Sequence, residues 1–364
     1  MKVIFRVDAS LKMGTGHLMR CLTLADALRA DGAQCHFITR EHPGHLNSVV
    51  LQRGHGLSAL PYNAKEPLSE PLAPAHADWL GDSWQNDAQQ TATLLASLKP
   101  DWLVVDHYAL EQRWERQVTE YCQRLLVIDD LADRNHCCNI LLDQNLGSTP
   151  EDYIGKIPAS CKLLLGTQFA LLRPEFAELR DRSLARRNNR SISNLLISMG
   201  GVDAPNATGR VLAALHPIAE PDWRIQVVMG ATAPWLSEVQ SLVNDMPCTT
   251  QVLVNTSDMA QIMSGSDLAI GAAGATSWER CCLGVPSIML ILAENQRGIG
   301  IHLEQAGAAS VIPSVDQITD QLPVQMERLR SPERLQQMAL AAAAITDGQG
   351  TQRVKNALFQ LDRY

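Results

Sequence analysis

The stretch KVIFRVDASLKMGTGHLMRCLTLADALRA, residues 2–30, decides how the rest of the chain is interpreted. Its first six residues form an apolar run that is typical of a buried strand, and its second half has the apolar spacing of an amphipathic helix. Between these two segments, Gly14 and Gly16 would let the backbone turn tightly and approach a ligand closely, and His17 follows at once. The stretch therefore predicts a βα unit with an imidazole at the mouth of its helix.

The same alternation continues along the first half of the chain. Further strands are predicted at 34–39, 101–107 and 124–130, and helices at 91–99 and 111–122, whereas 56–90 shows too weak a pattern to assign. Strands separated by helices indicate a parallel sheet with helices on both faces. We therefore expect a Rossmann-like N-terminal domain over residues 1–170 that carries His17.

A charged segment, RPEFAELRDRSLARRNNR at 173–190, interrupts the pattern, and we interpret residues 171–190 as a linker with a short helix. The alternation then restarts and predicts a second Rossmann-like domain over 191–345, followed by a C-terminal segment, 346–364, whose helix packs back on the first domain. The expected fold is α/β, with two parallel sheets. Since ligands of such sheets bind beyond the carboxyl ends of the strands, we expect the active site in the interdomain cleft.

Composition excludes several classes of protein. The chain has 364 residues and a net charge of −8, and it has no basic tract of the kind that binds nucleic acid. Its nine cysteines are scattered and none lies in a CxxC, which argues against a structural zinc site. The longest apolar run, SIMLILA from Ser287, is far shorter than the ~20 residues of a membrane span. We expect a cytoplasmic protein with no membrane contact, and no protein partner can be inferred.

The N-terminal candidates surround the glycine turn. Free amides at the start of the helix could bind an anion at Gly14 and Gly16, although the position of a third fingerprint glycine is taken by Met19, which argues against a dinucleotide site. Alternatively, the glycines only make the turn and His17 caps the helix. Arg6 and Asp8 lie on or just beyond the first strand, where they could pair with each other or contact substrate.

The C-terminal candidates follow three predicted strands. In GAAGATSWERCCLG, 271–284, the amides around Gly274, Ala275 and Thr276 could receive a diphosphate. Glu279, one turn on, could accept hydrogen bonds from ribose hydroxyls, or simply favour the start of the helix. Other polar or glycine positions at strand ends are Asn295 and Gln296, which could read sugar substituents or form a polar turn, and Gly200 and Gly201, which permit close approach of a phosphate or base. Asp203 or Asn206 could cap the following helix.

Two further pairs of neighbouring residues have no assigned role. Asp106–His107 and Asp129–Asp130 end two successive predicted strands. Paired carboxylates there could bind a divalent metal, or they could cap helices and bridge strands. His107 is a second possible base.

Taken together, these motifs resemble the UDP-sugar hydrolases of pseudaminic acid biosynthesis. The resemblance rests on FRVDASLKMGTGHLMRCLTLADAL, VVDHY, VIDDLADR, LLDQN, LLGTQFALLRPEF, ISMGG and GAAGATSWERCCLGVP, and covers nearly the whole chain. It implies a GT-B type fold, similar to that of the peptidoglycan GlcNAc transferase, with UDP held by the C-terminal domain.

The resemblance also implies a reaction. Water would replace UDP at the anomeric carbon of UDP-2,4-diacetamido-2,4,6-trideoxy-β-L-altropyranose, in a pathway that leads to flagellin glycosylation. His17 would be the general base, Glu279 would hold the ribose and Asn295 would contact substrate, with no metal and no cofactor. The residue types suit these roles, because an imidazole of ordinary pKa ~6.5 can take a proton from water near neutral pH, and helix amides stabilise a leaving diphosphate.

Three alternatives remain. The first is a GT-B glycosyltransferase, in which His17 would activate an acceptor hydroxyl; the second is a related hydrolysing UDP-sugar epimerase. The third is a sensor that binds a UDP-sugar without turnover, although no output domain is evident. An acceptor site for a membrane-bound substrate would need an apolar and basic patch, and FITREHPGHLNSVVLQRGHG at 37–56 is only mildly basic. The sequence therefore favours water as the acceptor.

Overall fold

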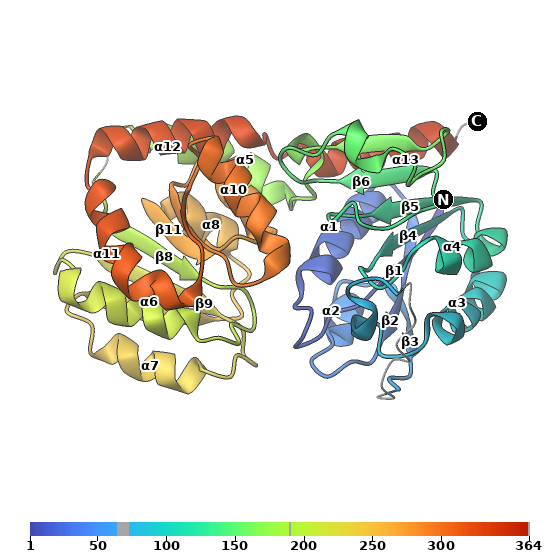
Figure 1. Cartoon of the computed structure of the whole chain (residues 1–364), viewed down its shortest axis with the longest axis horizontal. Coiled ribbons are helices and arrows are strands. Elements are labelled where there is room, and N and C mark those ends of the chain that lie inside the picture. Colours follow the sequence, from blue (N-terminus) through green and yellow to red (C-terminus); the bar gives the residue numbers. More distant parts are fainter. Residues whose placement is uncertain (64–72, 189–190, 363–364) are drawn as a thin grey trace. The chain divides into compact units, whose positions relative to one another are not determined.

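The computed structural model describes residues 1–63, 73–188 and 191–362, and it divides into two compact units (Figure 1). Unit 1 comprises Met1–Leu171 together with Gly350–Tyr364, and unit 2 comprises Leu172–Gln349. Each unit is built on a single sheet in which all of the paired strands are parallel. The α/β class and the two parallel sheets predicted from the sequence are therefore confirmed.

The sheet of unit 1 has seven strands in the order β3-β2-β1-β4-β5-β6-β7. The strands are β1 (Lys2–Val7), β2 (Gln34–Arg40), β3 (Gly56–Leu60), β4 (Trp102–Asp106), β5 (Arg124–Ile128), β6 (Ile140–Asp143) and β7 (Lys162–Leu165). The chain winds outward from β1 to β3 and then returns to the other side of β1 to continue with β4. This is the doubly wound order, and ligands of such sheets bind where the order reverses, here between β1 and β4.

Helices cover both faces of this sheet (Figure 1). They are α1 (Gly16–Ala30), α2 (Asn47–Gln52), α3 (Trp84–Leu98), α4 (Gln112–Val118) and α13 (Gly350–Asp362), with 3-10 turns η1 (Ala77–Trp79), η2 (Thr119–Tyr121), η3 (Pro150–Tyr153) and η4 (Thr167–Phe169). Alternate residues of β1 separate the two cores. Val3 and Phe5 pack in one cluster with Leu22 of α1 and Leu358 of α13, and Ile4 packs in the other with residues of α3 and α4.

The C-terminal helix α13 is part of unit 1. Its residues Val354 and Leu358 are buried in the same cluster as Leu18 and Leu28 of α1, and Lys355 Nζ lies 2.5 Å from an Asp31 carboxylate oxygen. The weakly patterned segment 56–90 contains β3, η1 and the start of α3, and its residues 64–72 lie outside the described residues.

The sheet of unit 2 has six strands in the order β10-β9-β8-β11-β12-β13. The strands are β8 (Asn194–Ser198), β9 (Arg224–Met229), β10 (Thr249–Val254), β11 (Leu268–Ala272), β12 (Ser287–Leu290) and β13 (Ser310–Ile312). The helices are α5 (Pro174–Ala185), α6 (Ala207–Leu215), α7 (Leu236–Asn244), α8 (Met259–Gly265), α9 (Thr276–Cys282), α10 (Arg297–Gln305), α11 (Ile318–Arg328) and α12 (Pro332–Ile345), with 3-10 turns η5 (His216–Ile218), η6 (Glu294–Gln296) and η7 (Val315–Gln317). The order again reverses between β8 and β11.

The charged segment that the sequence suggests as a linker carries helix α5, which belongs to unit 2. Arg180 donates to the backbone carbonyls of Cys282, Ala343 and Thr346, and the buried Arg187 donates to that of Leu283. Arg180 on α5 and Arg187 just beyond its end therefore hold unit 2 together, which explains the charge of this segment. No helix among the described residues is long and apolar enough to cross a membrane.

Candidate functional site

The turn after β1 places His17 near the end of β4. Ser10 and Gly14 exchange backbone hydrogen bonds of 3.2 and 2.9 Å, and Gly14 has a φ of +77°, a conformation that side chains disfavour. Helix α1 begins at Gly16, so His17 lies in its first turn. Because β1 and β4 are neighbours with Val7 opposite Asp106, the carboxyl end of β4 lies beside this turn.

His17 and Asp106 form a hydrogen-bonded pair. Nδ1 of His17 lies 2.7 Å from Oδ1 of Asp106, whose side chain is fully buried. Arg20, one turn further along α1, donates to both oxygens of Asp106 at 2.6 and 2.7 Å. Burial opposes ionisation of Asp106, but the charge of Arg20 and the hydrogen bonds from Arg20 and His17 outweigh it and hold its pKa well below the ordinary value. An ionised Asp106 accepts a hydrogen bond from Nδ1–H of His17, which leaves the lone pair of the neutral imidazole on Nε2.

Asp130 and Tyr108 extend this group. Arg20 donates to Oδ2 of Asp130 at 2.5 Å, and the Tyr108 hydroxyl donates to the same atom at 3.0 Å. The Tyr108 ring also meets the His17 ring edge-on, with centroids 4.5 Å apart. Asp129 points elsewhere: it accepts from the amides of Leu131 and Ala132 and pairs with Arg134. Over the described residues, no group of three His, Cys, Asp or Glu side chains is arranged to hold a metal ion.

Arg6, Asp8 and His107 belong to a buried network instead. The Arg6 and Asp8 side chains have no exposed surface and pair at 2.7 Å, and Arg6 also pairs with Asp87. Nε2 of the buried His107 lies 3.3 Å from Asp8, while its Nδ1 accepts from the amide of Ala109. Arg6 and Asp8 thus pair with each other, which is one of the two roles that the sequence offers, and neither side chain has exposed surface with which to contact substrate here.

In unit 2, a glycine turn follows β8, and the helix after it, α6, is capped by side chains, unlike α1 in unit 1. Gly200 has a φ of +91° and nothing would contact a side chain added there, so Gly200 leaves open space after the end of β8, whereas the backbone of Gly201 packs against Gly230. Asp203 accepts from the amides of Ala207 and Thr208, both at 2.9 Å, and Asn206 from that of Gly209. Both residues therefore cap α6, as the sequence predicts.

The remaining candidates gather after β11. Over the described residues, the amides of Ala275 and Thr276 have no hydrogen-bond partner, and the exposed Ala275 precedes the first residue of α9. The Gln296 amide nitrogen lies 4.0 Å from where a Cβ on Gly274 would be, whereas the neighbouring Asn295 is exposed. Gly274, Thr276 and Gln296 are thus brought together.

Glu279, in α9, has an unusual environment. Its side chain is only 17% exposed, and its nearest cation is Arg173, with Nη2 3.9 Å from Oε1. Burial raises the pKa of Glu279 to about 7, which the charges of Arg173 and Arg280 only partly offset. When ionised, Glu279 can accept hydrogen bonds from the donor groups of a ligand, in place of the water that burial excludes.

Arg20 and Tyr108 are residues of this site to which the sequence alone assigns no role. The spacing of His17 and Arg20, three residues apart on one helix, places them on the same face and is the signal that could have linked them.

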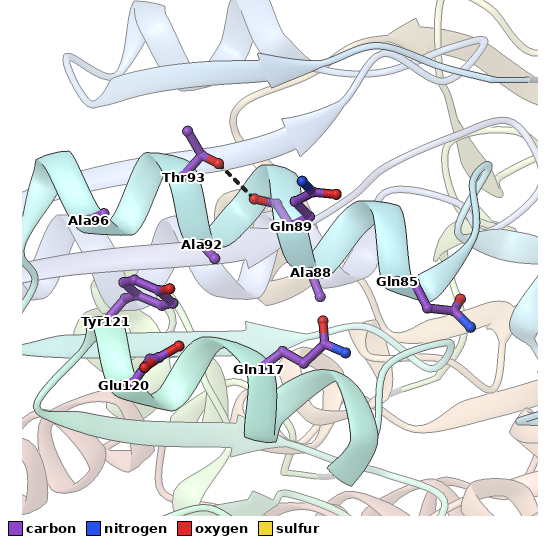
Figure 2. A pocket seen from close by; sticks show the side chains of 9 residues that line it. All are labelled: Gln85, Ala88, Gln89, Ala92, Thr93, Ala96, Gln117, Glu120 and Tyr121. Carbon is purple, nitrogen blue, oxygen red and sulfur yellow. Dashed lines mark hydrogen bonds between the residues drawn. The ribbon is translucent and has the colours of Figure 1, made fainter.

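A separate groove in unit 1, of about 620 Å³, lies between α3 and the α4–η2 segment, and its lining includes Gln85, Gln89 and Gln117 (Figure 2). None of the residues around the proposed base lines this groove: His17, Arg20, Asp106, Tyr108 and Asp130.

Comparison with known proteins supports the motif resemblance. Residues 210–356 match the model of the glycosyltransferase family 28 C-terminal domain. The UDP-2,4-diacetamido-2,4,6-trideoxy-β-L-altropyranose hydrolase of Campylobacter jejuni is 24% identical over 309 residues, which cover 84% of this chain and 97% of that protein. An uncharacterized protein of Methanocaldococcus jannaschii is 25% identical over 302 residues, 82% of this chain, and the match spans only 57% of that protein's length. The resemblance to the pseudaminic acid hydrolases is confirmed.

Solved structures agree with this fold. MurG of Acinetobacter baumannii is similar with a TM-score of 0.70 at 18% identity, covering 99% of both chains. The UDP-GlcNAc 2-epimerase of Neisseria meningitidis, solved with UDP-GlcNAc, has a TM-score of 0.56 at 13% identity, covering 99% of this chain and 100% of that one. The chain therefore has the GT-B type fold with two Rossmann-like domains.

Proposed function

We propose that this protein hydrolyses a UDP-linked diacetamido-trideoxyhexose to UDP and the free sugar. Water forms a new bond to the anomeric carbon as the bond from that carbon to the UDP oxygen breaks. The proton lost by water passes to His17, and the leaving UDP takes the bonding electron pair. An enzyme that acts on UDP-sugars is supported by the similarity to the Campylobacter hydrolase and by the family 28 match.

The observation that carries the proposal is the contact between His17 and Asp106. A general base must hold its lone pair toward the proton that it takes. The ionised Asp106, 2.7 Å from Nδ1, fixes the imidazole so that Nε2 is the accepting atom, and it stabilises the imidazolium that forms. Asp106 is therefore a positioning residue, and Arg20 holds Asp106 in place.

The nucleotide would be held by unit 2. The amides of Ala275 and Thr276 would receive the diphosphate, and Glu279 would accept the hydroxyls of the ribose. Gly200, with the adjoining Gly201, would permit close approach of the nucleotide, and Gln296 would contact the phosphate or sugar from beside Gly274, with Asn295 next to it. These positions need no metal, and we propose that turnover is metal-independent.

Glycosyl transfer is the competing activity, because residues 210–356 match a glycosyltransferase domain. The two activities differ in whether UDP is released when no acceptor is present. Incubation of the purified chain with a panel of UDP-diacetamido-trideoxyhexoses and UDP-GlcNAc, in excess EDTA, tests both points. We expect UDP release from a diacetamido-trideoxyhexose without acceptor or metal. Release only after an acceptor is added would favour transfer, and a complete requirement for magnesium or manganese would place a metal in the reaction.

A further inference from the structure

Three aromatic rings in mutual contact, of which one adjoins His17, form what we call the aromatic wall: His76, Trp79 and Tyr108. Tyr108 meets His17 edge-on. Trp79 stacks on Tyr108 with centroids 5.7 Å apart and planes 30° apart. His76 lies 4.4 Å from Trp79 and 5.5 Å from Tyr108. The wall thus begins at the proposed general base and extends away from it.

Two of these residues come from a segment whose role the sequence does not reveal. His76 immediately precedes η1 and Trp79 is its last residue, between β3 and α3 of the same unit as His17. Asp78, also in η1, pairs with Lys12 of the loop between β1 and α1. The segment is therefore tied to the same loop that positions His17.

The wall offers a ligand mainly aromatic carbon. Tyr108 is buried, while His76 and Trp79 are half-buried, so these two rings supply the accessible part. Burial lowers the pKa of His76 below its ordinary value, which favours the neutral form of its ring. The polar groups beside Tyr108 already hold one another, because Arg20 and His17 bind Asp106, and Arg20 and Tyr108 bind Asp130. Arg134, whose guanidinium carbon lies 5.4 Å from the centre of the Tyr108 ring, pairs with Asp129.

We propose that His76 and Trp79 bind the apolar face of the substrate's hexose ring and select sugars that carry a methyl group at C6. This inference rests on the proposed function, since it places the sugar beside His17. Ring C–H groups and methyl groups pack favourably on aromatic faces. A hydroxyl at C6 pressed against the same carbon surface would lose its hydrogen bonds to water without replacement. The wall therefore favours 6-deoxyhexoses over hexoses with a free 6-hydroxyl.

The test compares Trp79→Ala and Trp79→Phe with Trp84→Ala, a matched control at a half-buried tryptophan at the start of α3. Affinity is measured by calorimetry for a UDP-linked 6-deoxy diacetamido sugar, for UDP-GlcNAc and for UDP alone, and UDP release is followed in parallel. We expect Trp79→Ala to weaken binding of the 6-deoxy sugar nucleotide by about tenfold, the scale of one lost aromatic contact. The change should appear mainly in KM, with partial recovery in Trp79→Phe, and with UDP and the Trp84 variant unaffected.

The outcomes separate this inference from the proposed function. Trp79-dependent binding of the 6-deoxy sugar without UDP release would uphold the aromatic wall and contradict hydrolysis. UDP release with unchanged affinity and unchanged preference in Trp79→Ala would contradict the wall and uphold hydrolysis. Equal losses for UDP alone and for both sugar nucleotides would show a structural effect and overturn the proposed selectivity, as would a wild-type protein that binds no sugar nucleotide.

Discussion

Nδ1 of His17 lies 2.7 Å from Oδ1 of Asp106, although 89 positions separate the two residues in the chain. The contact follows from topology: β1 and β4 are adjacent parallel strands, so the turn after one meets the end of the other. The sheet therefore brings an imidazole and its orienting carboxylate together at the point where strand order reverses, which is where such sheets bind ligands.

Replacing the proposed base should slow the chemical step without affecting nucleotide binding. His17→Asn keeps a polar side chain of similar size but removes the group that takes the proton. General-base catalysis contributes about 10²–10⁴-fold, so kcat should fall by that factor. UDP affinity, measured by calorimetry, should stay the same because its proposed contacts lie in unit 2. A variant with nearly normal kcat would remove His17 from the role of base.

Replacing Asp106 should disturb the state of His17 rather than remove it. In Asp106→Asn the fixed negative acceptor of the Nδ1 proton is lost, and we expect kcat to fall by about 10²-fold or more. Nitrogen NMR of the imidazole gives a readout that a general loss of stability would not move. The wild-type protein should show a protonated Nδ1 at high pH, and the variant a mixture of tautomers. Identical imidazole spectra in both proteins would show that Asp106 does not set the tautomer.

Much of this arrangement can be predicted from local sequence pattern. The strand at 2–7 and the helix that follows it are recognisable from an apolar run and from the helical spacing of Leu18, Leu22, Ala25 and Leu28, which are all buried, and the doubly wound class follows from the alternation of such units. The caps at Asp203 and Asn206 are also predictable, since a cap is a local interaction.

Other features depend on distant contacts and leave no local signal. Strands β6 and β7 have four residues each and no clear helix between them, so no alternation marks them. The arginines of α5 appear as surface charge until Arg180 is seen donating to three carbonyls from distant positions. Arg6 and Asp8 look like site residues because they lie at the carboxyl end of a strand. Only the position of Asp87 in α3 shows that Arg6 forms buried ion pairs with both Asp8 and Asp87.

UDP affinity should depend on pH through Glu279. Its pKa of about 7 in the free protein means that it is largely protonated at pH 6 and largely ionised at pH 8. If the ionised form accepts the ribose hydroxyls, affinity should rise about tenfold across this range, following the ionised fraction. Glu279→Gln should bind UDP more weakly by about 1.5–3 kcal/mol at pH 8, the range for a hydrogen bond to a charged group.

The Glu279→Gln variant also serves as the control for titration of the UDP phosphates, which occurs in both proteins. The difference between wild type and variant, measured by calorimetry at pH 6, 7 and 8, should therefore grow with pH. A constant difference over this range, or equal affinities at pH 8, would contradict the proposed contact with the ribose.

Helix α5 should be essential to the stability of unit 2. Arg180→Met removes the donors to three backbone carbonyls while keeping much of the apolar stem. We expect a loss of about 2–4 kcal/mol in the free energy of unfolding, because partly buried carbonyls lose charged donors. Arg182→Met, at an exposed position of the same helix, is the matched control and should change stability little. Equal urea midpoints for both variants would indicate that α5 does not brace the unit.

The central claim is that water, activated by His17, attacks the anomeric carbon, and isotope labelling tests it most directly. The wild-type protein is incubated with a UDP-diacetamido-trideoxyhexose in water enriched in oxygen-18, and both products are analysed by mass spectrometry at early times. The account predicts the heavy oxygen in the free sugar and none in UDP, with this labelling slowed in His17→Asn. Heavy oxygen in the UDP phosphate would place the attack at phosphorus, and an absence of UDP release would contradict hydrolysis itself.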